Sequence, residues 1–154
     1  MRVETEIEIA APAEKIWIVL ADLPRWPEWA PGFELVEQLT SGPLSSGKKL
    51  RYRLRPFGLP ITVSATVTVY EMRPPWRMEL RRRGLVTEKI VYELRRGSGQ
   101  TIVSRGHTAT GWLAWFLAPA LKPSASLQSR RLLAALQRCV ESPAVDGEHC
   151  CNGI

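Results

Sequence analysis

The chain has 154 residues, 45% of them hydrophobic and 23% charged, which are the proportions of an ordinary soluble domain. Its formal charge of +6 permits nucleic acid, anionic lipid or an acidic protein as a partner without choosing among them. No apolar run approaches the roughly 18 residues of a membrane span, and the N-terminal MRVETEIEIA is too charged for a signal peptide. Three cysteines do not make a disulfide framework, so we expect a single-domain cytoplasmic protein.

The N-terminal part of the chain is typical of one strand followed by two short helices. Residues 2–10 alternate strictly between charged side chains and uncharged ones, which is the pattern of a half-buried strand. Pro12 suits the first position of a helix. Asp22 can cap a second short helix that ends at Pro31 and Gly32.

Six further segments are predicted to be strands: 33–39, 49–55, 61–72, 76–82, 86–96 and 101–111. Alternation is clearest in 61–72, where Val67 and Val69 are expected among the inward residues. A three-residue turn at 83–85 keeps the apolar residues of the next hairpin on one face and places Glu88 inward, opposite Leu80. Alternation alone leaves two choices for the side chains of the last strand that face inward. They are either Val103, Arg105, His107 and Ala109, or Ile102, Ser104, Gly106 and Thr108.

The C-terminal region is expected to hold one long helix over 124–141. Its apolar face has bulky residues in its second half: Leu132, Leu133, Leu136, Cys139 and Val140. The same face begins with small residues, which either pack closely against another element or leave a space. The preceding segment 112–121 is apolar all round and is predicted to be a cavity lid or a surface that touches a membrane. Residues 143–154, which include Cys150 and Cys151, have no periodicity and are expected to be disordered.

Two features of the chain carry a resemblance to known proteins. One is the order of these elements, and the other is a pair of stretches near the start, IAAPAEKIW at 9–17 and LPRWPEW at 23–29. Over residues 2–141 the chain resembles the START-like or SRPBCC superfamily of Bet v 1-like helix-grip proteins, most closely its bacterial polyketide cyclase/dehydrase-like branch. The resemblance implies an α+β helix-grip fold, in which a seven-stranded antiparallel sheet wraps around a long C-terminal helix with two short helices after the first strand. It also implies an apolar cavity between the sheet and that helix.

Two loops and one strand position are carried over from this resemblance. Residues 57–60 look like the gate loop of plant helix-grip receptors, and residues 83–85 stand where the latch would be, without the latch's histidine. Arg105 occupies the position at which cyclase-like members carry an aromatic side chain that faces the cavity. This favours the register in which Arg105 and His107 face inward.

Ligand binding is the function that the sequence predicts first. The ligand is expected to be a small hydrophobic molecule such as a lipid, an isoprenoid or a polyketide-like chain. The side chains expected to contact it are Trp26, Trp29, Tyr52, Leu54, Phe57, Leu59, Val63, Ala65, Val67, Trp76, Met78, Leu80, Ile90, Tyr92, Trp112, Ser129 and Leu132.

An enzyme is the alternative, and a membrane-surface carrier of lipid or quinone is the third interpretation. Glu88, Arg105 and His107 would form an ionisable cluster suited to general acid–base chemistry on an enolisable ketone, as in a polyketide cyclase, aromatase or dehydratase. A buried ion pair that only satisfies itself is the competing explanation for the same residues. Cys139, His149, Cys150 and Cys151 lack the spacing of a closed zinc site, so no metal and no cofactor are expected.

Arginines alternate along strands that are expected to be neighbours: Arg51, Arg53, Arg55, Arg77, Arg81 and Arg83. They form either a docking patch for an acidic carrier protein or an anionic membrane, or simply a solvated face. Nucleic acid is not expected, because these strands lack the exposed aromatic residues that single-strand binders place among basic ones.

Overall fold

A computed structural model describes residues 1–55 and 58–142. The elements run in the order β1 (Arg2–Ile9), α1 (Ala13–Ala21), the 3-10 helix η1 (Leu23–Arg25), α2 (Trp26–Trp29), β2 (Phe33–Gln38), β3 (Lys49–Leu54), β4 (Ile61–Glu71), β5 (Trp76–Arg82), β6 (Thr87–Arg96), β7 (Thr101–Thr110) and α3 (Trp112–Glu141). The predicted Phe57 and the tail at 143–154 lie outside the described residues.

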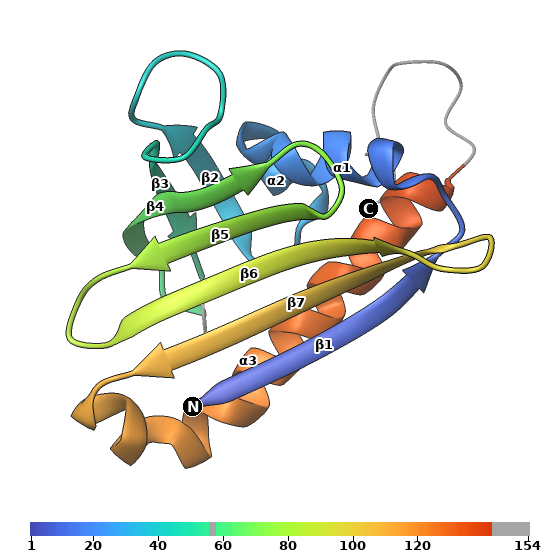
Figure 1. The fold of residues 1–154 in the computed structure, drawn as a ribbon. Helices are drawn as coiled ribbons and strands as arrows, with labels where there is room; N and C mark the ends of the chain where they lie inside the picture. Colours follow the sequence, from blue (N-terminus) through green and yellow to red (C-terminus); the bar gives the residue numbers. More distant parts are fainter. Residues whose placement is uncertain (56–57, 143–154) are drawn as a thin grey trace.

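The strands form one antiparallel sheet in the order β1-β7-β6-β5-β4-β3-β2. The short helices connect β1 and β2, which lie at opposite edges, and α3 lies across one face of the sheet (Figure 1). This is the α+β helix-grip arrangement that the sequence predicted. A sheet with one long helix on its inner face must curve around that helix to bury its apolar side chains.

The long helix begins twelve residues earlier than expected, at Trp112 rather than Ser124, and contains Pro119 and Pro123. A proline inside a helix removes one backbone hydrogen bond and crowds the carbonyl one turn before it. Here the two prolines are one turn apart and both exposed, so water can reach the disturbed carbonyls. In Figure 1 the first part of α3, in orange, runs at an angle to the rest, as expected of a helix with internal prolines.

The second half of α3 closes the core as predicted. Leu132 and Leu136 are fully buried and Cys139 is buried with them. The α3 C-terminus is held against the start of the chain, because a Glu141 carboxylate oxygen accepts a hydrogen bond of 2.9 Å from the Ala10 backbone N–H. This end of the helix is therefore anchored, while its other end extends beyond the sheet.

The prediction that Val69 faces inward was wrong, because β4 contains a bulge. Val67 pairs with Leu80, but Val69 pairs with the next residue along, Glu79. The extra residue reverses the alternation after Val67. Tyr70 consequently turns inward and packs against Trp17, with 5.7 Å between the ring centroids.

The β5–β6 register differs from the prediction by two residues. Leu80 pairs with Ile90 rather than Glu88, and Glu88 pairs with Arg82, so the connecting loop is longer than three residues. A shift of two residues leaves each side chain on its original face, and Glu88 still points inward. In β7 the predicted face is confirmed: Arg105 is only 4% exposed and lies opposite Tyr92.

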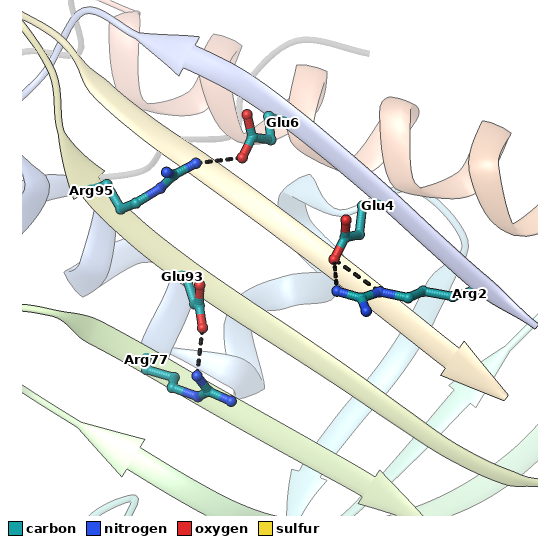
Figure 2. A network of polar contacts seen from close by, with 6 residues as sticks. All are labelled: Arg2, Glu4, Glu6, Arg77, Glu93 and Arg95. Atoms are coloured by element: carbon teal, nitrogen blue, oxygen red, sulfur yellow. Dashed lines mark hydrogen bonds and ion pairs between the residues drawn. The ribbon is translucent and has the colours of Figure 1, made fainter. Parts of the chain in front are cut away.

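The outer face of the sheet carries ion pairs between strands (Figure 2). Arg77 binds Glu93 on the neighbouring strand at 2.7 Å, and Arg95 binds Glu6 across β7. Arg51 binds Glu37 at 3.1 Å in the same way. The arginine-rich strands therefore supply many of their own counter-charges, which favours a solvated face over a docking patch for an acidic carrier protein.

Candidate ligand-binding cavity

A cavity of about 580 Å³ lies between the inner face of the sheet and the middle of α3. Its walls come from η1, α2, all strands except β1, and one face of α3. The α3 residues that reach it recur at helical spacing: Leu121, Ser124, Ala125, Leu127, Gln128 and Arg131. Leu127 and Ile61 line the cavity and are 49% and 40% exposed, so the cavity opens to solvent between α3 and the start of β4.

Small side chains on α3 create this space. Ser124 and Ala125 face the sheet where the cavity lies, whereas Leu132 and Leu136 fill the corresponding volume further along the helix. The middle of α3 therefore forms a wall of the cavity, whereas the leucines in its second half fill the space against the sheet. Closely packed interiors leave no such volume unless side chains are too short to meet.

Several of the residues predicted to contact a ligand line this cavity: Trp26, Tyr52, Leu54, Leu80, Ile90 and Tyr92, together with Glu88, Arg105 and His107. Others lie on the same inner face of the sheet but are not among the residues that line the cavity: Val63, Ala65, Val67, Trp76 and Met78. Leu132, on α3, is fully buried and does not line the cavity either. They are part of, or pack against, the hydrophobic core. Alternation identified their face correctly but did not identify which part of that face is covered by the leucines of α3.

The remaining predicted contacts take other places. Trp29 packs against Trp26 at 5.6 Å between centroids, behind the cavity wall. Ser129 is fully buried and supports Arg105 rather than lining the cavity. Leu59 and Trp112 are 70% and 75% exposed, so their side chains lie in solvent.

Arg105 projects from β7 and is held by two hydroxyl groups. Its Nε donates a hydrogen bond of 3.0 Å to the Tyr92 hydroxyl oxygen, and its Nη1 donates one to Ser129 Oγ. No carboxylate lies within ion-pair distance of its guanidinium in residues 1–55 and 58–142. A guanidinium is always protonated in a protein, so Arg105 contributes an unbalanced positive charge to the cavity.

Glu88 forms an ion pair with a different arginine, Arg82. Its Oε2 lies 2.7 Å from Arg82 Nη2, and its Oε1 lies 3.9 Å from His107 Nε2. The first distance is that of a charge-assisted hydrogen bond. The second is too long for a hydrogen bond. Arg82 and Glu88 therefore neutralise each other.

His107 is largely buried, with a side chain that is 12% exposed, and it is neutral. Burial, followed by the charges of Arg105, Arg82 and the amino terminus, lowers the pKa of His107 from 6.5 to about 4. The nearby Glu88 does not reverse this effect, because desolvation and the three positive groups together outweigh one carboxylate that is paired elsewhere. Within the described chain, both ring nitrogens of His107 are buried without a hydrogen-bond partner, so the neutral imidazole holds one unused donor and one unused acceptor.

A second neutral donor comes from Tyr52. Burial raises the pKa of the Tyr52 hydroxyl to about 12, even though the charge of Arg82 opposes the shift. The group is therefore protonated at neutral pH. The polar groups that line the cavity include the guanidinium of Arg105, the imidazole of His107, the hydroxyls of Tyr52 and Tyr92 and the Arg82–Glu88 ion pair, with Arg55, Ser124, Gln128 and Arg131 on the remaining wall.

Sequence reasoning predicted that the long helix walls the cavity but named Ser129 and Leu132 for this role, and neither of them lines it. Leu121, Ser124, Ala125 and Gln128 repeat every three or four residues, which is the signal of one helix face. Placing the helix start at Ser124 excluded only Leu121, whereas Ser124, Ala125 and Gln128 lie inside the predicted helix and were not recognised as wall residues. The strand and short-helix contributions of Leu23, Phe33, Val36 and Leu50 were also not predicted.

Sequence comparison agrees with this geometry. The family model described as polyketide cyclase/dehydrase and lipid transport matches residues 1–141. The chain belongs to this family. The resemblance to the START/SRPBCC superfamily is thus confirmed. The search of curated protein sequences found no match to this member of the polyketide cyclase/dehydrase and lipid-transport family.

Solved structures share the fold of this family member at low sequence identity. The protein TTHA0849 from Thermus thermophilus is 15% identical, with a TM-score of 0.78 over 94% of this chain and 100% of that one. A START superfamily protein from Mycobacterium smegmatis is 19% identical, with a TM-score of 0.72 over 91% and 97%. The Zhui aromatase/cyclase from a Streptomyces species is 17% identical, with a TM-score of 0.67 over 94% and 98%.

Proposed function

We propose that the protein binds a small amphipathic molecule whose apolar body fills the cavity and whose anionic head group meets Arg105. The observation that carries this proposal is the buried guanidinium of Arg105, which has no carboxylate partner among the described residues. A buried charge is costly unless it is paired. A ligand carboxylate would supply the missing charge, and the neutral His107 and Tyr52 would donate further hydrogen bonds to it.

The size and walls of the cavity support a ligand of lipid or polyketide dimensions. Its volume of about 580 Å³ falls within the roughly 300–1,000 Å³ that is common for small-molecule sites. Apolar and aromatic side chains make up most of the wall, and Arg82, Glu88, Tyr92, Arg105 and His107 lie together on β5, β6 and β7. This division suits a molecule with one polar end, such as a fatty acid or another carboxylated chain.

The test compares dodecanoate with dodecanol, which differ only in the head group. The wild-type protein should prefer the acid. Arg105→Met should reduce affinity for dodecanoate about 10–100-fold, because a hydrogen bond to a charged group contributes about 1.5–3 kcal/mol. Affinity for dodecanol should change little. Arg53→Met, which removes an exposed arginine from the outer face, is the matched control.

Two results would overturn this proposal. One is equal affinity of the wild-type protein for the acid and the alcohol. The other is an Arg105→Met variant that melts cooperatively and still prefers the acid. Native mass spectrometry of the purified protein, followed by lipid extraction, would identify the natural ligand directly.

An enzyme of the cyclase or dehydratase type is the second candidate. His107 supports it, because this residue lines the cavity and its ring nitrogens have no hydrogen-bond partner among the described residues, and Arg105 beside it would stabilise an enolate oxygen. Its pKa of about 4 argues against it, because such an imidazole is a weak general base at neutral pH. His107→Ala separates the two functions: turnover of a poly-β-ketone substrate should fall about 10²–10⁴-fold in an enzyme, whereas a binder has no turnover to lose.

A further inference from the structure

The first part of α3 exposes an unusual amount of apolar surface. Trp112, Trp115 and Phe116 are 75%, 74% and 66% exposed, and Leu117 is 41% exposed. Phe116 contacts both tryptophans edge-on, with 6.4 Å to the Trp112 ring and 5.2 Å to the Trp115 ring. Large exposed apolar patches on soluble domains mark interaction surfaces.

The β5–β6 loop extends this surface. Leu85, at the tip of that loop, is 88% exposed. The loop lies beside the start of α3, because a Cβ placed at Gly111 would be 3.7 Å from the Leu85 carbonyl oxygen. We call Leu85, Trp112, Trp115, Phe116 and Leu117 the aromatic patch. None of these residues is part of the cavity wall, whereas Leu121, at the end of the predicted segment 112–121, is.

We propose that the aromatic patch docks the protein onto the surface of an anionic lipid bilayer. Tryptophan and phenylalanine on one end of an amphipathic helix suit the interfacial zone of a membrane, where rings are buried among head groups and acyl chains. No helix in the described residues is long and apolar enough to cross a membrane. The contact would therefore be peripheral, with the helix lying in the interface.

Charge around the patch selects an anionic surface. Residues 112–140 of α3 contain four basic residues, Lys122, Arg130, Arg131 and Arg138, and no acidic one. Lys122 and Arg83 are exposed next to the patch on α3 and on the β5–β6 loop. Basic side chains beside an apolar face add attraction to anionic lipids.

The same charges disfavour a second copy of this chain as the occupant. A twofold interface brings each surface against its own equivalent. Both copies would bring Lys122 and Arg83 into one shared interface, without acidic residues on α3 before Glu141 to balance them. An anionic bilayer meets both the apolar and the basic part of the surface.

The position of the patch connects docking with the cavity. Leu121 and Ser124, which line the cavity, follow the patch within about two turns of the same helix. Arg82, also in the cavity wall, lies three residues before Leu85. Docking would bring the cavity opening to the bilayer, so that an amphipath could enter from the membrane. This consequence rests on the proposed ligand function, whereas the docking itself does not.

Vesicle flotation tests the proposal with the full chain. The wild-type protein should float with vesicles of phosphatidylcholine mixed with phosphatidylglycerol and bind vesicles of phosphatidylcholine alone more weakly. Trp115→Ser combined with Phe116→Ser should lower the affinity at least about tenfold, since two large rings leave the interface. Lys122→Glu should weaken binding to the anionic vesicles only. Ile18→Ser is the matched control, because Ile18 is 71% exposed on α1, far from the patch.

Three outcomes would overturn the docking proposal. The first is wild-type protein that fails to float with either kind of vesicle. The second is a Trp115→Ser/Phe116→Ser variant that binds as well as wild type. The third is a wild-type protein that sediments as a dimer and does not bind vesicles, together with a variant that sediments as a monomer. This result would assign the patch to self-association. The variant should retain wild-type affinity for dodecanoate in solution, so failure of docking and failure of ligand binding are separate results.

Discussion

The buried imidazole of His107 makes protein stability depend on pH in a direction that can be calculated. In the unfolded chain a histidine takes up a proton near pH 6.5, whereas the native His107 does so only near pH 4. Between these values the unfolded state binds the extra proton, so the free energy of unfolding falls as the pH falls. At about 1.4 kcal/mol per pH unit, the loss is about 3 kcal/mol and levels off below the native pKa.

The groups around His107 explain why its proton is disfavoured. Arg105 on the same strand, Arg82 from β5 and the amino terminus before β1 are all positive, and burial acts in the same direction. Glu88 on β6 is the nearby carboxylate, and it is engaged by Arg82. A substitution that keeps the shape but removes titration, His107→Gln, should therefore remove this part of the pH dependence.

Urea unfolding of wild type and His107→Gln at pH 7 and pH 4 measures the effect. The other ionisable groups are the same in both proteins, so their contributions cancel in the comparison. Wild type should lose about 3 kcal/mol more than the variant over this interval. An identical loss in both proteins would refute the neutral, desolvated imidazole and restore His107 as a candidate general base.

Three further predictions concern packing, the Arg105 anchor and the cavity mouth. Leu136→Ala should lower the free energy of unfolding by about 2–5 kcal/mol in a denaturant titration, because Leu136 is fully buried; an unchanged midpoint would contradict the packing of α3. Ser129→Ala removes one acceptor from Arg105 and should weaken dodecanoate binding measured by calorimetry, while equal affinity would show that Ser129 does not position the guanidinium. Dodecanoate should slow hydrogen exchange in 83–85 and 112–123 beside the cavity, and equal exchange rates with and without it would argue against entry at this end.

Strand faces followed from the sequence because side chains alternate with a period of two residues. Once Val103 was placed inward, Arg105 and His107 had to share its face, and the structure confirms this. The offset of the β5–β6 hairpin did not follow, because a shift of two residues leaves every face unchanged. The bulge after Val67 could not be predicted either, because the sequence around it alternates without interruption.

The order of the elements, most of the buried faces and the resemblance to the family follow from the chain alone, because these depend on local periodicity and on short motifs. Which buried residues border a space depends instead on the three-dimensional packing. Met78 and Tyr92 are direct partners on neighbouring strands and equally buried, yet only Tyr92 lines the cavity. The distinction depends on where α3 presents Ser124 and Ala125 instead of leucines, and therefore on the path of a helix that continues through two prolines. The unbalanced charge of Arg105 is likewise a tertiary property, because it results from which side chains β6, β7 and α3 bring within reach of one guanidinium.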